Sequence, residues 1–191
     1  AMSIALNSLS SLLSTLATGC FIIGCVGYAS DRTAFKNLAW ITIDEDDTQA
    51  WFALKKSYFK TALGSTTLSY NDGSCVAEYC DKCKEMGEAC FTLMVIATVF
   101  AFVTSCATGS LTKRASTLLQ ILSLGLTGVA LAASIIGIGM FMSDCKDKID
   151  DATNLELDWG PGSIVVLVGI ILMGITGVAQ VLGTLCCRGA L

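Results

Sequence analysis

Cysteines are the residues of this chain best suited to covalent chemistry, and five of its ten fall in or beside the polar segments. These five are Cys75, Cys80, Cys83, Cys90 and Cys145. Cysteines in an oxidising outer compartment form disulfides by default, so we expect bridges among them. Because five is an odd number, two bridges would leave one residue over. Either Cys90 is a buried free thiol, or one cysteine pairs between molecules.

Two patterns could bind a metal ion. Cys80-x-x-Cys83 has the spacing of half a zinc site, but the chain has no His and no second Cys-x-x-Cys, so we expect disulfide chemistry instead. The acidic run Asp44, Glu45, Asp46 and Asp47 could collect Ca²⁺, which takes several carboxylate oxygens. The alternative, which we favour, is a solvated acidic turn.

Residues for catalysis are missing from the sequence. It has no His, no Gly-rich phosphate loop and no Ser or Cys paired with a base. Catalysis usually needs a base that titrates near neutral pH. We therefore expect neither an enzyme nor a cofactor-binding protein, and no nucleic-acid partner.

Composition indicates a membrane protein. Hydrophobic residues make up 53% of the 191, and the mean hydropathy is +0.68. About 20 apolar residues cross a bilayer as a helix. Four uncharged stretches are that long, namely 4–29, 91–111, 115–142 and 161–187. They predict a single tetraspan domain in contact with lipid. A cleaved signal peptide fits the first stretch less well, because its start is not rich in Lys or Arg and its apolar run is too long.

Charge predicts the orientation. All sixteen acidic residues lie in 31–88 and 144–158, together with nine basic ones, whereas the other segments carry only Lys113, Arg114 and Arg188. Positive charge favours the cytoplasmic side. We therefore expect both termini in the cytoplasm and the loops 30–90 and 143–160 outside the cell, in the plasma membrane. The spans themselves carry no ionisable residue, which argues against a transporter or pump.

The first outer loop has the patterns of a small sheet. Residues 38–43 are β-branched and aromatic and predict a strand, while 49–63 has helical spacing, with Trp51, Leu54 and Tyr58 on one face. Residues 66–70 and 74–79 flank Asn71-Asp72-Gly73, which is a hairpin signal. In the second loop, 155–157 predicts an edge strand, and Pro161 marks the start of the last helix. The expected fold is an all-α membrane four-helix bundle with a small extracellular antiparallel β-sheet.

Small residues recur at helical spacing inside the spans, where they allow helices to approach closely. The candidate packing and assembly positions are Ala97, Ala101, Ser105, Gly109, Gly125, Gly128, Gly174 and Gly177. They fit either a tightly packed monomeric bundle or a face that meets a neighbouring molecule in the membrane. Next to the last span, Cys186 and Cys187 are either palmitoylation sites or a pair of small residues that end a helix.

The order of these features resembles the claudin superfamily, which includes the peripheral myelin protein, the epithelial membrane proteins and the calcium-channel gamma subunits. Trp40 stands for the family's early Trp, and Cys75 and Cys80 stand for its cysteine pair at a shorter spacing, with Cys83 as a further candidate partner. Tetraspanins fit less well, because their Cys-Cys-Gly motif is missing. The resemblance implies a sheet built mainly by the first outer loop, with one strand from the second. It also implies lateral polymerisation or attachment to another membrane protein.

These observations predict a structural membrane protein that self-associates laterally into strands or arrays. Alternatives are an auxiliary subunit of a channel or receptor, and a paracellular or oligomeric pore that uses the acidic loops. The expected partners are the lipid bilayer, other copies of the chain and, for the auxiliary subunit, another membrane protein.

Overall fold

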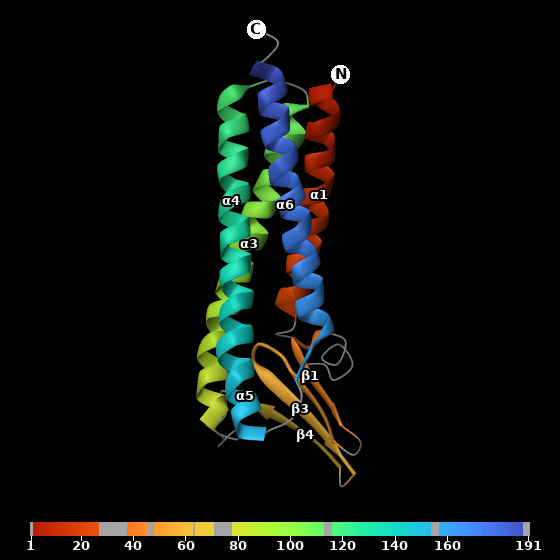
Figure 1. Ribbon diagram of the computed structural model, residues 1–191, viewed down its shortest axis with the longest axis vertical. Coiled ribbons are helices and arrows are strands. Elements are labelled where there is room, and N and C mark those ends of the chain that lie inside the picture. Colours follow the sequence, from red (N-terminus) through yellow and green to blue (C-terminus); the bar gives the residue numbers. More distant parts are fainter. Residues whose placement is uncertain are drawn as a thin grey trace. The chain divides into compact units, whose positions relative to one another are not determined.

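A computed structural model describes residues 2–26, 38–45, 48–62, 64–70, 78–112, 116–153 and 157–188. Four long helices are present: α1 (Met2–Val26), α3 (Glu78–Leu111), α4 (Thr117–Met140) and α6 (Pro161–Arg188) (Figure 1). Each is long and apolar enough to cross a membrane. This result confirms the expectation of four helices with the length and composition of membrane spans.

Two of the helices continue beyond the predicted spans. The helix α3 begins at Glu78 rather than near residue 91, so its first turns carry charged residues. After α4, the chain continues through a π-helical turn (Phe141–Cys145) into the short helix α5 (Lys146–Thr153). Hydrophobic length alone could not predict these extensions, because amphipathic and charged turns can be helical as well.

Contacts along the chain divide it into two compact units. Unit 1 consists of Ala1–Ile22, Val95–Ile135 and Leu167–Leu191, and it contains part of every long helix. Unit 2 consists of Ile23–Met94 and Ile136–Val166, and it contains the sheet and the remaining helical turns.

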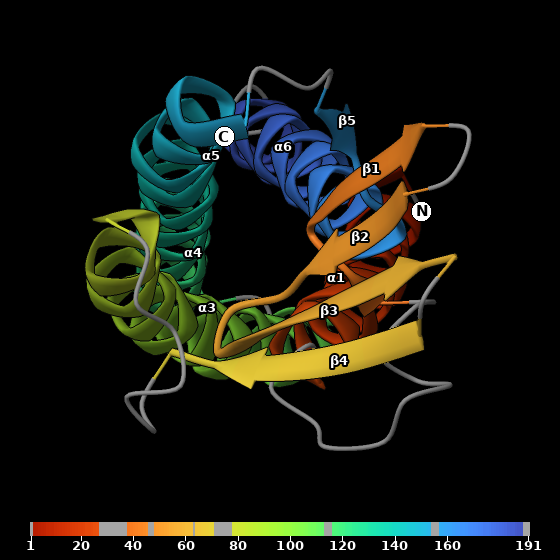
Figure 2. The same cartoon turned by 90° about the horizontal axis from the view of Figure 1, so that it is seen from below.

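A five-stranded antiparallel sheet lies in Unit 2, in the order β4-β3-β2-β1-β5 (Figure 2). Its strands are β1 (Ile41–Glu45), β2 (Thr48–Phe52), β3 (Lys56–Thr61), β4 (Gly64–Ser69) and β5 (Asp158–Trp159). Four strands come from the first loop and one from the second. The strand β1 is displaced by a few residues from the predicted strand at 38–43. Of the strand predicted at 155–157, Leu155 and Glu156 lie outside the described residues, and β5 begins at Asp158.

The helix predicted over 49–63 is wrong, because β2 and β3 form a hairpin there. Trp51 and Tyr58 are partners across this hairpin, with ring centroids 5.5 Å apart. Their separation of seven residues matches two turns of a helix as well as this pairing, so periodicity alone could not decide. Aromatic and β-branched residues favour the strand once a partner strand is available.

The hairpin predicted around Asn71-Asp72-Gly73 is only partly testable. Its first strand corresponds to β4, whereas the turn lies outside the described residues. The proposed second strand, 74–79, is wrong at its end, because Glu78 and Tyr79 already belong to α3. Pro161 begins α6, as expected from its fixed φ and missing N–H.

Trp40 is the centre of the Unit 2 core. Its side chain is fully buried, and its ring meets Phe141 edge-on at a centroid distance of 5.4 Å. The Trp40 backbone N–H donates to the Phe52 carbonyl (2.8 Å), and its own carbonyl accepts from the Gly160 N–H (2.8 Å) and the Ser163 hydroxyl (3.0 Å). One residue thus joins β2 to the start of α6.

Glycine allows the sheet to approach α3 closely. A Cβ atom at Gly87 would overlap the carbonyl oxygen of Leu54, in the turn between β2 and β3. Leu54 itself is almost fully buried. Only a residue without a side chain can occupy this position while that backbone contact is kept.

Candidate assembly surface

The small residues on α3 pack inside the chain. Ala97 and Ala101 are fully buried. A turn or two further on, the Ser105 hydroxyl lies 2.6 Å from that of Thr15 on α1, and a Cβ at Gly109 would lie 3.4 Å from the Ser11 hydroxyl oxygen. Of these predicted assembly positions, Ser105 and Gly109 are therefore used for the contact of α3 with α1.

The contact between α1 and α3 leaves a shallow groove of about 440 Å³ in Unit 1. It is lined by Ser8, Ser11, Leu12, Thr15, Leu16, Gly109 and Thr112. Two of its hydroxyls, those of Ser11 and Thr15, belong to the same interhelical hydrogen-bond cluster, because Ser11 also donates to the Ser105 carbonyl (3.2 Å) and Thr15 meets the Ser105 hydroxyl.

Glycines on α6 differ in their surroundings. A Cβ at Gly177 would lie 3.5 Å from the Thr127 side chain of α4, so this glycine also packs within the chain. Gly169 approaches Phe21 and Cys20 of α1 still more closely. Gly174, in contrast, has open space where a Cβ would be.

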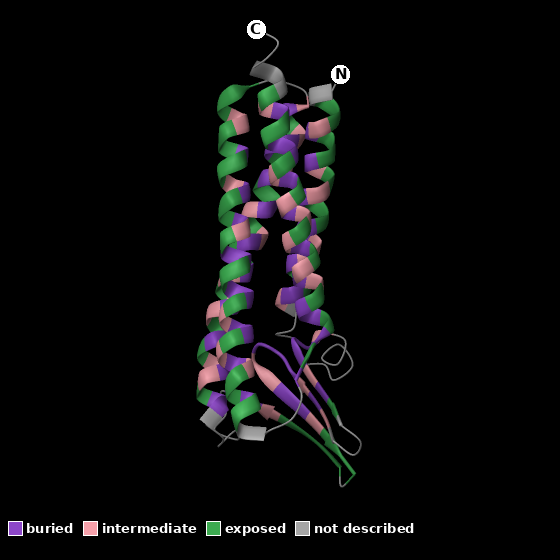
Figure 3. Ribbon diagram, in the orientation of Figure 1, coloured by how far each residue is buried: buried purple, intermediate pink, exposed green. Residues whose placement is uncertain are grey.

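The helix α4 carries a face of small residues that no described part of the chain covers. Gly125 and Gly128 are exposed, and a Cβ at either would have nothing within 4 Å. Exposed residues on this helix recur at alternating spacings of three and four (Figure 3). They are Leu118, Ile121, Gly125, Gly128, Ala132 and Ile135, and we call them the α4 face.

The helix α6 shows what an ordinary exposed face of this chain looks like. Its large exposed side chains are all branched and apolar. They are Ile164, Val168, Ile171, Ile175, Val178, Val181, Leu182 and Leu185. Exposed glycine and alanine thus distinguish the α4 face from the exposed positions that the structure describes on α6.

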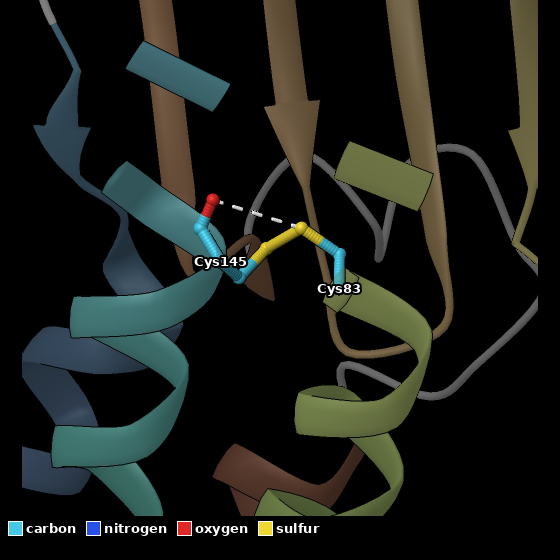
Figure 4. Close-up of a disulfide and its surroundings, with 2 residues drawn as sticks. All are labelled: Cys83 and Cys145. Carbon is cyan, nitrogen blue, oxygen red and sulfur yellow. Dashed lines mark hydrogen bonds between the residues drawn. A yellow bond between two sulfur atoms is a disulfide. The ribbon is translucent and has the colours of Figure 1, made fainter. Parts of the chain in front are cut away.

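A disulfide holds two helical segments of Unit 2 together. Cys83 on α3 and Cys145 in the π-helical turn form a disulfide across 62 residues (Figure 4). Cys80 is also disulfide-bonded, while Cys75 lies outside the described residues. Cys90 is a buried free thiol, the first of the two alternatives that the odd number left open.

Only part of the acidic run, the candidate Ca²⁺ site, lies in the described residues. Asp44 is exposed on β1 and accepts a hydrogen bond from the Gln49 amide of β2 (2.9 Å). Glu45 ends the same strand, and Asp46 and Asp47 lie outside the described residues. Among the described residues, no three His, Cys, Asp or Glu side chains are grouped to hold a metal ion.

The strand β4 is one edge of the sheet. Its sequence, Gly-Ser-Thr-Thr-Leu-Ser, has no charge and no proline, and its first four residues are exposed. Exposed edges usually carry charges or proline that prevent pairing with another chain. This edge has neither.

A buried tyrosine lies where β4 ends. The Tyr70 side chain is almost fully buried, and its hydroxyl has no hydrogen-bond partner of normal geometry among the described residues. Burial raises the pKa of the Tyr70 phenol far above its usual range; nearby Tyr79 adds to the rise, and the Ser57 hydroxyl opposes it.

Cys186 and Cys187, the candidate palmitoylation sites, belong to the last turn of α6, but their side chains are outside the described residues.

The buried polar residues of Unit 1 were not predicted from the sequence. The available signal was the i, i+4 spacing of Ser and Thr on helices that are otherwise apolar.

Comparison of the chain with protein-family models gives no match, and comparison with curated proteins gives none either.

Proposed function

We propose that this chain is a structural integral membrane protein that self-associates laterally, with the α4 face as the contact between copies. The α4 face is the observation that carries the proposal. Helices in lipid gain little from the hydrophobic effect, so they associate where small residues let their backbones come close. Gly125, Gly128 and Ala132 offer such a contact, and no described part of the chain uses it.

The edge of the sheet provides a second contact of the same kind. The unprotected backbone groups of β4 suit pairing with a strand from another molecule. A membrane contact through α4 and an edge contact through β4 would give each copy two surfaces. Two different surfaces are what growth into a strand or array requires, because a single self-complementary surface ends at a dimer.

The sidedness of the protein is part of the proposal. We place both termini and the Lys113–Arg114 turn in the cytoplasm, and the sheet outside the cell at the plasma membrane. The distribution of charge supports this orientation, and the disulfide between Cys83 and Cys145 suits an oxidising compartment. A claudin-like architecture is also proposed, supported by four first-loop strands joined to one strand of the second loop.

Energy transfer between labelled copies in liposomes tests the α4 contact. We expect transfer for the unchanged protein at protein-to-lipid ratios where random proximity gives none. Gly125→Leu and Gly128→Leu should each reduce it several-fold, because a branched side chain keeps the two helix backbones apart.

Cys106→Leu is the matched control, since Cys106 is exposed on α3 and gains the same side chain. It should leave energy transfer unchanged. A wild-type protein that remains monomeric would contradict the proposal. So would equal transfer in the glycine variants and the control, which would move the contact away from α4. Loss of a co-purified larger membrane protein in the glycine variants would instead assign the α4 face to an auxiliary subunit's contact.

A further inference from the structure

Beside Asn7, Thr18 and Ser134, the interior of Unit 1 holds four pairs of buried polar residues, one pair on each long helix with its two members four positions apart. All eight are no more than 7% exposed. They are Ser10 and Ser14 on α1, Thr104 and Thr108 on α3, Ser123 and Thr127 on α4, and Thr176 and Gln180 on α6. We call this set the polar belt. Its members include no ionisable group.

Contacts between the helices place the polar belt at one level of Unit 1. Gly183 faces Leu6 and Asn7, and Gly169 faces Cys20 and Phe21, so Gln180 lies opposite the turn that contains Ser10. On the other side of α1, Ser11 and Thr15 meet Ser105 of α3, next to Thr104. Gln180 reaches α4 directly.

In the half of the polar belt on α4 and α6, side chains form hydrogen bonds between the two helices. The Gln180 amide nitrogen donates to the Ser123 hydroxyl (2.8 Å), and its amide oxygen accepts from the Thr127 hydroxyl (3.0 Å). These bonds link α6 to α4 and give Ser123, Thr127 and Gln180 partners.

The other half of the polar belt, on α1 and α3, has no such hydrogen bonds between its side chains among the described residues. Ser14 and Thr108 donate to carbonyls of their own helices, those of Ser10 (2.8 Å) and Thr104 (2.9 Å). The hydroxyls of Ser10 and Thr104 are both fully buried, and neither has a hydrogen-bond partner among the described residues. Two buried, unpaired hydroxyls therefore lie in the interior of Unit 1, one on α1 and one on α3.

We propose that the polar belt is a binding site for water inside the membrane-spanning part of Unit 1, with Ser10 and Thr104 as two of its ligands. Buried polar groups in proteins are paired, and a buried water with two to four polar partners is the usual means where side chains do not meet. The belt also supplies acceptors. Ser14 and Thr108 direct their protons to helix carbonyls, which leaves hydroxyl lone pairs for the protons of a water molecule.

Water is favoured over other occupants by the chemistry of the belt. Its residues are seven hydroxyls and one carboxamide, with no carboxylate to neutralise a cation and no basic group for an anion. A small uncharged molecule that both donates and accepts matches this set. The inference does not depend on self-association, because every residue involved lies in the interior of Unit 1.

A crystal structure of the wild-type protein at a resolution that shows ordered water is the direct test. Density within hydrogen-bond distance of the Ser10 and Thr104 hydroxyls is expected. Direct packing of these side chains with no density between them, or density for a lipid chain or an ion, would overturn the proposal.

The variants Ser10→Ala and Thr104→Val give an independent test with a definite sign. If the hydroxyls bind water, each variant should lower the melting temperature by about 2–4 °C, the shift that a loss of about 1 kcal/mol produces in a chain of this size. If the hydroxyls are unpaired in a dry interior, removing them should raise it or leave it unchanged. The second result would contradict the proposal.

Ser8→Ala and Thr92→Val are matched controls, because they make the same changes at exposed positions of the same two helices. Neither should shift the melting temperature. If Ser10 and Thr104 hold the same water, the double variant should lose less than the two single variants together. Strict additivity would show that the two hydroxyls do not share a ligand.

Discussion

The indole N–H of Trp40 donates to the backbone carbonyl of Gly24 at 3.3 Å, within the last turn of α1. The last four carbonyls of a helix have no partner inside it. Trp40 therefore satisfies one of these carbonyls while its ring fills the Unit 2 core. The early Trp of the first loop thus has a structural role in the chain itself.

Trp40→Phe should destabilise the protein by about 1–3 kcal/mol, because it keeps an aromatic ring but leaves the buried Gly24 carbonyl unpaired. Thermal unfolding in detergent measures the change. Trp159→Phe is the control: Trp159 is 46% exposed, and its replacement should have little effect. Equal effects of the two changes would show that the hydrogen bond contributes nothing.

The Cys83–Cys145 disulfide should contribute about 4 kcal/mol by restricting the unfolded chain, given its separation of 62 residues. We expect the double variant Cys83→Ser/Cys145→Ser to unfold at a lower temperature and to be less sensitive to reductant. Cys106→Ser should behave like the wild type, because Cys106 is an exposed free thiol. Peptide mapping without reduction that pairs Cys83 with another cysteine would contradict the assigned bridge.

Alkaline pH should destabilise the protein through Tyr70. Its pKa is higher in the folded chain than in the unfolded chain, where tyrosine titrates near pH 10. The contribution is therefore fully present below about pH 10 and is lost as the pH rises further, because only the unfolded chain then releases the proton. Unfolding followed from pH 8 to 12 should show this loss in the wild type and less of it in Tyr70→Phe. An identical pH dependence of the two proteins would contradict the role given to Tyr70.

The membrane spans were predictable because hydrophobic length is a local property of the sequence. The fold of the first loop was less so. Whether Trp51 and Tyr58 are neighbours on a helix or partners across a hairpin depends on the strands β1 and β4, which lie elsewhere in the chain. The charged first turns of α3 were not predicted for a related reason. They contact distant parts of the chain, through the Cys83–Cys145 disulfide and through Gly87 beside Leu54. Composition alone does not reveal such contacts.

The candidate assembly positions could be found from the sequence but not sorted by it. Ser105 and Gly128 are both small residues at helical spacing. Only the structure shows that Ser105 meets α1, whereas Gly128 has open space around it. The i, i+4 spacing of Ser and Thr could have marked Ser10 and Thr104 as candidates for burial, but whether their hydroxyls find partners depends on how the helices meet.

Cryo-electron tomography of native membranes that carry the protein tests lateral self-association most directly. The account predicts rows or a lattice with a repeat close to the width of one four-helix unit, and loss of that order in the Gly125→Leu/Gly128→Leu double variant. Cys106→Leu membranes should retain it. Isolated particles with no in-plane order in the wild type, or particles docked beside a larger density, would contradict the central claim.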